Sequence, residues 1–235
     1  MAERDTERAD RILDAASELL ARWGYRKVTV DEIVRRADVG KGTVYLHWRS
    51  RDELLFAVLL REGAATFDEL AQGMRADPAE VALHRYVRTV FLHAMRRPLL
   101  AAIYTRDTEV LGRLVTTDGS RGVAHSKMTL STEHFALLAK HGLLRADLSA
   151  EQIAYGIGSV VLGHLIIDPM LPPELAMPVE TKADLLAEMI RSSFEPPGEP
   201  SERTLAEIAP KVIGIVEGLR DTYRDHVYGP TDGKK

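Results

Sequence analysis

The hydrophobic positions of this chain recur mostly every three or four residues, which is the period of an amphipathic helix. In residues 6–23, Ile12, Ala16, Leu19 and Trp23 follow this spacing, while charged side chains occupy the other faces. Comparable apolar stripes or segments predict further helices at 51–74, 77–97, 99–104, 107–114, 125–141, 149–167, 179–194 and 203–223. No segment convincingly shows the two-residue alternation of a strand, so the pattern predicts an all-α fold.

Residues 29–48 predict two short helices separated by a tight turn. Thr29 and Glu32 have the spacing of a capping box, in which the hydroxyl accepts from an amide and the carboxylate reaches back. Residues 38–40, Asp-Val-Gly, suit the left-handed backbone of a helix exit. A second helix at 41–48 is too short to be stable alone. These are the dimensions of a helix-turn-helix, whose second helix enters the major groove of DNA.

The charge of this region differs from that of the whole chain. Residues 22–51 contain eight Lys or Arg against three acids, a balance of about +5, whereas the whole chain carries −4. A basic patch in an acidic chain indicates a polyanionic partner for that segment alone. The alternative is a solvated surface with no partner.

Residues 8–56 carry a specific pattern: Gly24-Tyr25, Val28-Thr29-Val30, and the run from Ala37 through Tyr45, followed by Trp48 to Leu55. With these residues, the segment resembles the DNA-binding domain of the tetracycline-repressor (TetR) family. Asp38 stands where the family usually has Gly, and Gly40 stands where it usually has Ser. Losing the Ser removes a side-chain cap from the recognition helix, for which we expect a small stability cost.

The predicted DNA contacts lie on and around the second short helix. With Val44 and Trp48 packed inward, Thr43 and His47 share a face that can meet base edges. Thr43 could equally serve only the start of the helix. The resemblance implies backbone contacts for Lys41 and Tyr45, and a phosphate-facing helix start at Thr29. The full predicted set is Thr29, Lys41, Gly42, Thr43, Tyr45, His47, Arg49 and Arg51.

We expect two domains, a DNA-binding head at 1–50 and a larger domain at 51–228. The resemblance implies that the larger domain holds a small-molecule pocket between its helices. The candidate lining residues are Tyr86, Phe91, His93, Met95, Tyr104, Met128, His134 and Phe135. Each of them individually is more typical of an ordinary core position, because aromatic and Met side chains at helical spacing are mostly core.

The resemblance also implies a homodimer built from two helices near the C-terminus, here 149–167 and 179–194. Small residues would let backbones approach closely, and apolar residues of the second helix would add bulk. The predicted interface residues are Gly156, Val160, Gly163, Leu186, Met189 and Ile190. The alternative is that the glycines fit an intrachain neighbour. The helix at 203–223, which Pro210 should kink or restart, could cover the edge of this bundle or form part of the interface.

Several functional classes are disfavoured by what the sequence lacks. There is no cysteine, and His134 and His141 lie two turns apart, so we expect neither a metal site nor a cofactor. No catalytic motif, signal peptide or bilayer-spanning apolar run is recognisable, and we expect a cytoplasmic protein that is not an enzyme.

The sequence therefore predicts a DNA-binding transcriptional regulator. We expect a repressor that binds a near-palindromic operator as a dimer and is released by a small-molecule effector. The alternatives are a dimeric DNA-binding regulator without a ligand and, from another class, an all-α enzyme with an incidental helix-turn-helix.

Overall fold

The computed structural model describes residues 2–105, 114 and 132–228, and the regular elements within these ranges are all helical. The all-α prediction is therefore confirmed. The chain divides into two compact units: unit 1 spans 1–65, 98–124 and 221–235, and unit 2 spans 66–97 and 125–220. Two of the four boundaries between the units fall inside long helices, α4 (Arg51–Ala76) and α11 (Glu202–Tyr228). The predicted functional division at residue 50 stays a prediction.

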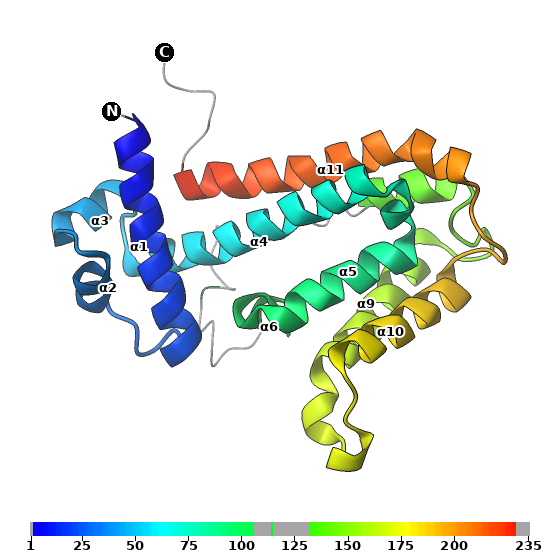
Figure 1. The fold of residues 1–235 in the computed structure, drawn as a ribbon, viewed down its shortest axis with the longest axis horizontal. Helices are drawn as coiled ribbons and strands as arrows, with labels where there is room; N and C mark the ends of the chain where they lie inside the picture. Colours follow the sequence, from blue (N-terminus) through cyan, green and yellow to red (C-terminus); the bar gives the residue numbers. More distant parts are fainter. Residues whose placement is uncertain (1, 106–113, 115–131, 229–235) are drawn as a thin grey trace. The chain divides into compact units, whose positions relative to one another are not determined.

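Unit 1 begins with three helices, α1 (Ala2–Trp23), α2 (Val30–Ala37) and α3 (Lys41–His47). Helix α1 packs against both α2 and α3 (Figure 1). The three helices and the start of α4 share an apolar core that water does not reach. Its fully buried side chains include Ile12, Leu13, Leu20, Ile33, Val44, Leu54 and Leu55. Helix α6 (Pro98–Thr105) also belongs to this unit.

Helix α2 begins and ends as its sequence predicts. The Thr29 hydroxyl accepts from the Glu32 amide at 3.3 Å, and the Glu32 carboxylate accepts from the Thr29 amide at 3.1 Å. Asp38 caps the other end in the left-handed conformation, with φ 52° and ψ 55°. Gly40 then begins α3 without a side-chain cap. The end of α2 at Asp38 and the start of α3 at Gly40 together determine where α3 lies relative to α2.

Ser50 and Glu53 at the start of α4 have the spacing of a capping box, but only half of it is formed. The Ser50 hydroxyl accepts from the Glu53 amide at 3.1 Å, as expected for the start of α4. The Glu53 carboxylate, however, accepts from the amide of Arg49 at 2.7 Å rather than from that of Ser50. It thereby joins α4 to the residue that follows α3 and Trp48.

The last turn of α11 packs on the first helix within unit 1. The Tyr228 hydroxyl donates a hydrogen bond to the carboxylate of Asp10, 218 positions earlier in the chain. Nearby, Gly63 on α4 faces the ring of Tyr223 on α11. Residues from both ends of the chain therefore complete this unit.

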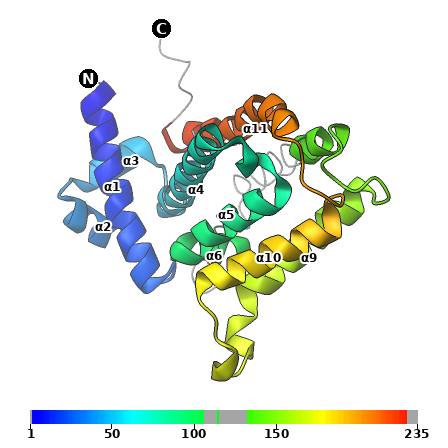
Figure 2. The same cartoon turned by 45° about the vertical axis from the view of Figure 1, so that its right-hand side comes forward.

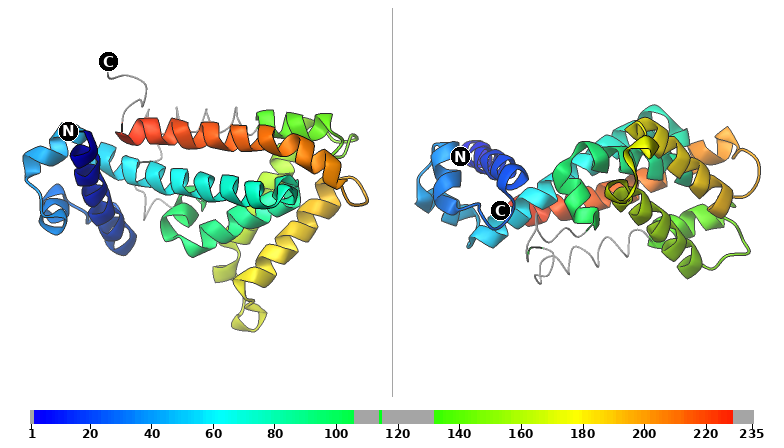
Figure 3. Two further views of the ribbon diagram at one scale, coloured as in Figure 1. Left: turned by 45° about the horizontal axis from the view of Figure 1, so that its top comes forward. Right: turned by 90° about the horizontal axis from the view of Figure 1, so that it is seen from below.

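Unit 2 contains the rest of α4 and α11 with α5 (Leu83–Arg96), residues 132–140, α9 (Ala150–Ile166) and α10 (Val179–Phe194). Helix α10 packs along α5 and also against α9 (Figure 2). Within this unit α11 runs beside α4, where the Arg220 guanidinium lies 3.0 Å from the Asp68 carboxylate (Figure 3). Short turns η3 (Asp168–Met170) and η4 (Pro173–Leu175) join α9 to α10.

Two predicted elements of unit 2 need correction. The expected single helix over 77–97 is a 3-10 turn, η1 (Pro78–Val81), followed by α5, because Ala82 takes an extended ψ of 137°. Pro210 does not restart the last helix, since α11 is continuous through it. The helix predicted at 125–141 is described only for 132–140, and that at 107–114 lies outside the described residues except for Leu114.

Candidate nucleic-acid interface

Helix α3 presents one buried and one open face. Val44 is fully buried, and Trp48 fills the core position expected of it. On the opposite side, Leu46 is 84% exposed and Tyr45 is 47% exposed. A Cβ atom placed on Gly42 would have nothing within 4 Å. The outward face of this short helix is thus formed by Gly42, Tyr45 and Leu46.

His47 does not belong to that outward face, which disfavours its predicted role at base edges. Its side chain is 17% exposed, and Nε2 lies 3.6 Å from the Asp5 carboxylate of α1, too far for a hydrogen bond. The ring lies 5.2 Å from the Trp48 ring. The physical reason is that α3 ends at His47, and Trp48 follows in extended backbone, which turns both rings toward the body of unit 1.

His47 and Trp48 border a groove of about 580 Å³ in unit 1. Neither His47 Nε2 nor Trp48 Nε1 has a hydrogen-bond partner in the described structure. The groove is lined by Asp5, Thr6, Ala9, Leu46, His47, Trp48, Glu53, Phe56, Ala57, Asp225, His226, Val227 and Tyr228. It separates the end of α3 from the last turn of α11.

Lys41 stands at the start of α3 with its ammonium 2.8 Å from the carboxylate of Asp31 on α2. The hydrogen bond and the charge of Asp31 raise the pKa of Lys41, so it remains a cation. Arg49 is exposed just after α3. Other exposed cations of the head include Arg22, Arg26, Lys27 and Arg35. These side chains can reach phosphates without disturbing the core.

Arg51 is engaged inside the unit, which disfavours its predicted contact with phosphates. Its Nη1 donates to the carbonyl of Val28 at 3.1 Å, and Nη2 lies 3.1 Å from Asp52. Its guanidinium carbon also stands 4.3 Å above the centre of the Tyr25 ring. The Tyr25 hydroxyl in turn donates to Asp52 at 2.9 Å. Arg51 therefore fastens the start of α4 to the segment before α2.

The remaining two predicted DNA residues lie at helix starts. Thr29 is exposed and caps α2, as described above. Thr43 is partly buried, and its amide donates to the carbonyl of Gly40 at 2.9 Å, within the first turn of α3. Both alternatives for Thr43, base contact or helix start, remain compatible with this position.

Three of the predicted ligand-binding residues lie together in unit 2. The buried His134 ring stands edge-on to Tyr86, with centroids 5.1 Å apart, and stacks on Phe135 at 6.1 Å. Burial lowers the pKa of His134 to about 4, and its Nε2 has no partner among the described residues. His134 is therefore a neutral, unsatisfied polar group inside an aromatic cluster.

The other predicted ligand residues are dispersed. Phe91 is a core residue whose ring meets that of His164 on α9 at 6.1 Å. His93 is partly buried, which lowers its pKa, and lies 3.0 Å from the Glu69 carboxylate. Met95 is partly buried. The Tyr104 side chain and Met128 lie outside the described residues.

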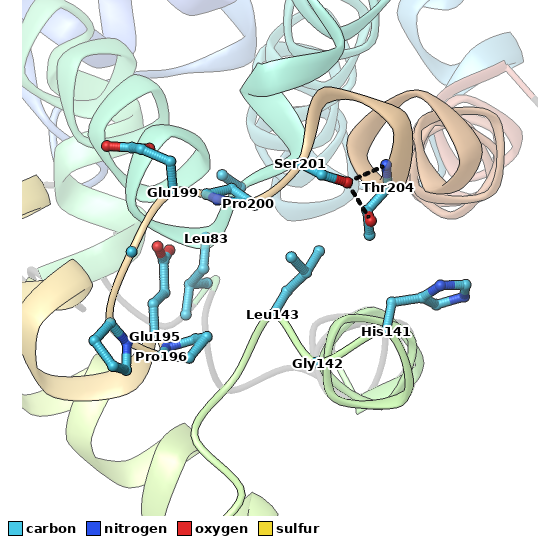
Figure 4. Close-up of a pocket in the computed structure, with 13 residues that line it drawn as sticks. Leu83, His141, Gly142, Leu143, Glu195, Pro196, Glu199, Pro200, Ser201 and Thr204 are labelled. Atoms are coloured by element: carbon cyan, nitrogen blue, oxygen red, sulfur yellow. Dashed lines mark hydrogen bonds between the residues drawn. The ribbon is translucent and has the colours of Figure 1, made fainter.

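The two cavities that we describe in unit 2 are lined by other residues, which the sequence did not suggest. One, of about 210 Å³, lies beneath the Pro-rich segment 196–200, with Leu83, Leu143 and Glu195 facing it (Figure 4). The other, of about 580 Å³, lies on the far side of that segment beside Arg145 and Arg191. Glu195 separates them and accepts from the His84 amide at 2.7 Å.

The predicted interface residues divide between inside and outside of unit 2. Leu186 and Ile190 are fully buried, and a Cβ on Gly156 would lie 2.5 Å from the Phe194 ring. These three positions therefore serve packing within the chain, because α9 and α10 meet through them. Val160 is partly buried, Met189 is exposed, and a Cβ on Gly163 would have nothing within 4 Å.

The geometry of α2, the turn and α3 is that of a helix-turn-helix DNA-binding domain, with the second helix presented outward. Residues 12–58 match the family model described as "Bacterial regulatory proteins, tetR family". This part of the chain is a TetR-family DNA-binding domain.

Curated relatives extend the similarity beyond the head. The chain is 35% identical over 103 residues to the transcriptional repressor KstR of Rhodococcus jostii, covering 43% of this chain and 47% of that protein. It is 28% identical over 107 residues to the regulator YhgD of Bacillus subtilis, covering 44% of this chain and 55% of that protein. The chain thus spans about half the length of these curated relatives.

Solved structures share the fold along most of the chain. The SmeT–triclosan complex superposes with a TM-score of 0.60 at 21% identity, covering 83% of this chain and 99% of that one. The fatty acid degradation regulator FadR from Bacillus halodurans gives 0.57 at 18% identity, covering 79% and 95%. At 18–21% identity, these likenesses show a shared fold.

Two features are absent from the described residues. No helix there has the length and apolar character needed to cross a bilayer. The same residues contain no cluster of three metal-ligating side chains.

Proposed function

We propose that this protein is a transcriptional regulator that inserts α3 into the major groove of DNA. The observation that carries the proposal is the outward face of α3, with Gly42, Tyr45 and Leu46 open to a partner while Val44 on the other side is fully buried. The match of residues 12–58 to the TetR-family model supports it. Lys41, Arg49 and Tyr45 are the side chains that we assign to phosphates.

DNA binding is tested by selecting operators from a random duplex library with the full-length protein and measuring affinity across salt concentrations. Phosphate contacts make log K fall linearly with log salt, by about 0.9 for each phosphate neutralised. Tyr45→Phe should weaken binding to every duplex to a similar degree. A protein that enriches no sequence and shows no salt dependence would overturn the proposal.

We further propose that it acts as a homodimer on a near-palindromic operator. Large exposed apolar side chains lie on α9, on the segment that follows it and on α10, and Tyr155 among them is 80% exposed. Single exposed apolar residues are ordinary, but a contiguous set marks an interaction surface. The exposed apolar residues from α9 to α10 are Tyr155, Leu162, Ile166, Ile167, Met170, Leu175, Met177, Leu185 and Met189. We propose these exposed residues as the dimer interface in place of Gly156, Leu186 and Ile190. Gly163 stays in the proposed interface.

Gly163→Leu tests the dimer, because the open space at Gly163 lets the larger side chain fit within the chain itself. We expect sedimentation to show monomers and operator binding to weaken, with helix content unchanged. Gly214→Leu on α11 is the matched control, since Gly214 also has nothing within 4 Å and is exposed. A Gly163→Leu protein that remains dimeric would move the interface elsewhere, with α11 as the first alternative.

The regulator is proposed to be a repressor released by a small molecule held in unit 2. The cluster of Tyr86, His134 and Phe135 supports this, because it joins apolar surface with a buried, unsatisfied nitrogen. Solved proteins of this fold are described with triclosan and with stearoyl-CoA. If operator affinity is unchanged across a broad panel of metabolites and drugs, the ligand-independent regulator becomes the better proposal.

A further inference from the structure

Leu46 is the most exposed large hydrophobic side chain in the described part of the chain. It lies on α3, four residues after Gly42, so the two positions form one ridge on the outside of the helix. Val44 on the opposite side is fully buried. The ridge therefore points directly away from the head, and Leu46 is its outermost side chain.

Nothing within the described chain explains why a leucine stands there. It borders the groove beside His47 and Trp48, but 84% of its surface remains exposed. An isolated surface leucine usually needs no explanation. On the face that approaches DNA, however, a leucine has no hydrogen-bond donor or acceptor. It therefore cannot form hydrogen bonds with phosphates or with base edges.

The major groove offers one apolar feature on an unmodified base pair, the C5-methyl group of thymine. Gly42 has no side chain, so it allows the backbone of α3 to come close to the bases beside Leu46. We propose that Leu46 determines operator specificity by packing against a thymine methyl group in each half-site. This inference rests on the proposed DNA-binding function.

The experiment compares thymine with deoxyuridine, which differs by that methyl group alone. Duplexes selected by the full-length protein are resynthesised with each thymine replaced in turn, symmetrically in both half-sites. For the wild-type protein one replacement should weaken binding about fourfold per half-site, the effect of one buried methyl group. Leu46→Ala should bind the thymine duplex more weakly and lose the distinction between thymine and deoxyuridine at that position.

Two further variants separate a methyl contact from a general loss of binding. Leu46→Met keeps an apolar side chain of similar reach, so it should retain the preference for thymine. Tyr45→Phe should weaken both duplexes equally. Since Leu46 is exposed, its replacement should leave the unfolding midpoint unchanged.

Two results would overturn the inference, and they are distinguishable. If operators are selected but Leu46→Ala keeps the same thymine preference as wild type at every position, the methyl contact is wrong and the DNA-binding function stands. If no duplex is enriched, the proposed function fails and the inference fails with it.

Discussion

Gly63 on α4 lies directly against the ring of Tyr223 on α11. A Cβ atom placed on Gly63 would stand 2.6 Å from Cε2 and 2.8 Å from Cδ2 of that ring, closer than packed atoms come. The two helices therefore approach each other in unit 1 at a distance that glycine alone permits.

Gly63→Ala should destabilise the protein. Overpacking of a buried contact typically costs about 1–3 kcal/mol, which exceeds the gain of roughly 1 kcal/mol from replacing glycine in a helix. Gly73→Ala on the same helix is the control, because Gly73 has open space and should show only the gain. Urea unfolding midpoints measure both. Equal stabilisation by the two substitutions would show that the Tyr223 ring yields without strain.

Arg51 should matter for folding more than for DNA affinity. Arg51→Lys keeps the charge but loses the planar group over Tyr25 and the bond to the Val28 carbonyl. We expect a loss of about 1–3 kcal/mol in unfolding free energy, typical of leaving buried polar groups unpaired. Arg49→Lys, at an exposed position, should leave stability unchanged. A stable Arg51→Lys protein with weakened operator binding would restore Arg51 to the phosphate contacts.

Asp31 should restrain Lys41 in the free protein. Asp31→Asn removes the carboxylate that raises the pKa of Lys41 and holds its ammonium. Lys41 stays a cation without Asp31, and its ammonium is then free to reach a phosphate. Operator binding should therefore tighten, and the salt dependence of that binding should persist. Lys41→Ala should instead flatten the slope of log K against log salt by about one. Fluorescence anisotropy from low to physiological salt measures both variants, with thermal unfolding as a check on α2.

His134 should make the protein sensitive to mild acid. Its pKa is lowered by burial to about 4, whereas the unfolded residue titrates near 6.5. The unfolded state therefore binds the extra proton first. The contribution of neutral His134 is present above pH 6.5 and is lost as the pH falls toward 4, on the order of 3 kcal/mol.

His134→Gln removes the titration while keeping a polar side chain. Its unfolding free energy should fall less steeply than that of wild type between pH 6.5 and 4. His93, whose pKa is also lowered by burial, remains in both proteins and cancels in the comparison. Parallel curves for the two proteins would show that His134 is protonated or hydrated in the folded state.

Local sequence rules predicted the elements that position α3. Thr29, Glu32 and Asp38 act within one or two turns of the backbone, so their spacing alone specifies where α2 begins and ends. The all-α fold followed from helical periodicity in the same way. Such features need no knowledge of distant residues.

The orientation of side chains around α3 could not be read with the same rules. Taking Trp48 as part of the helix placed His47 outward, whereas the helix stops at His47 and the chain turns. Which residues of a helix point inward also depends on contacts with residues far along the sequence. Gly156 illustrates this, because only the packed ring of Phe194 shows that it serves the chain's own interior.

The hydrogen bond between Tyr228 and Asp10 has a consequence for synthesis of the protein. The first helix is translated long before its partner in α11, because Tyr228 follows Asp10 by 218 positions. At about 5–20 residues per second, α3 would wait roughly ten to forty seconds for residue 228. The DNA-reading unit is therefore completed only after α11 has been translated, and a nascent chain carries its recognition helix before the unit that supports it is complete.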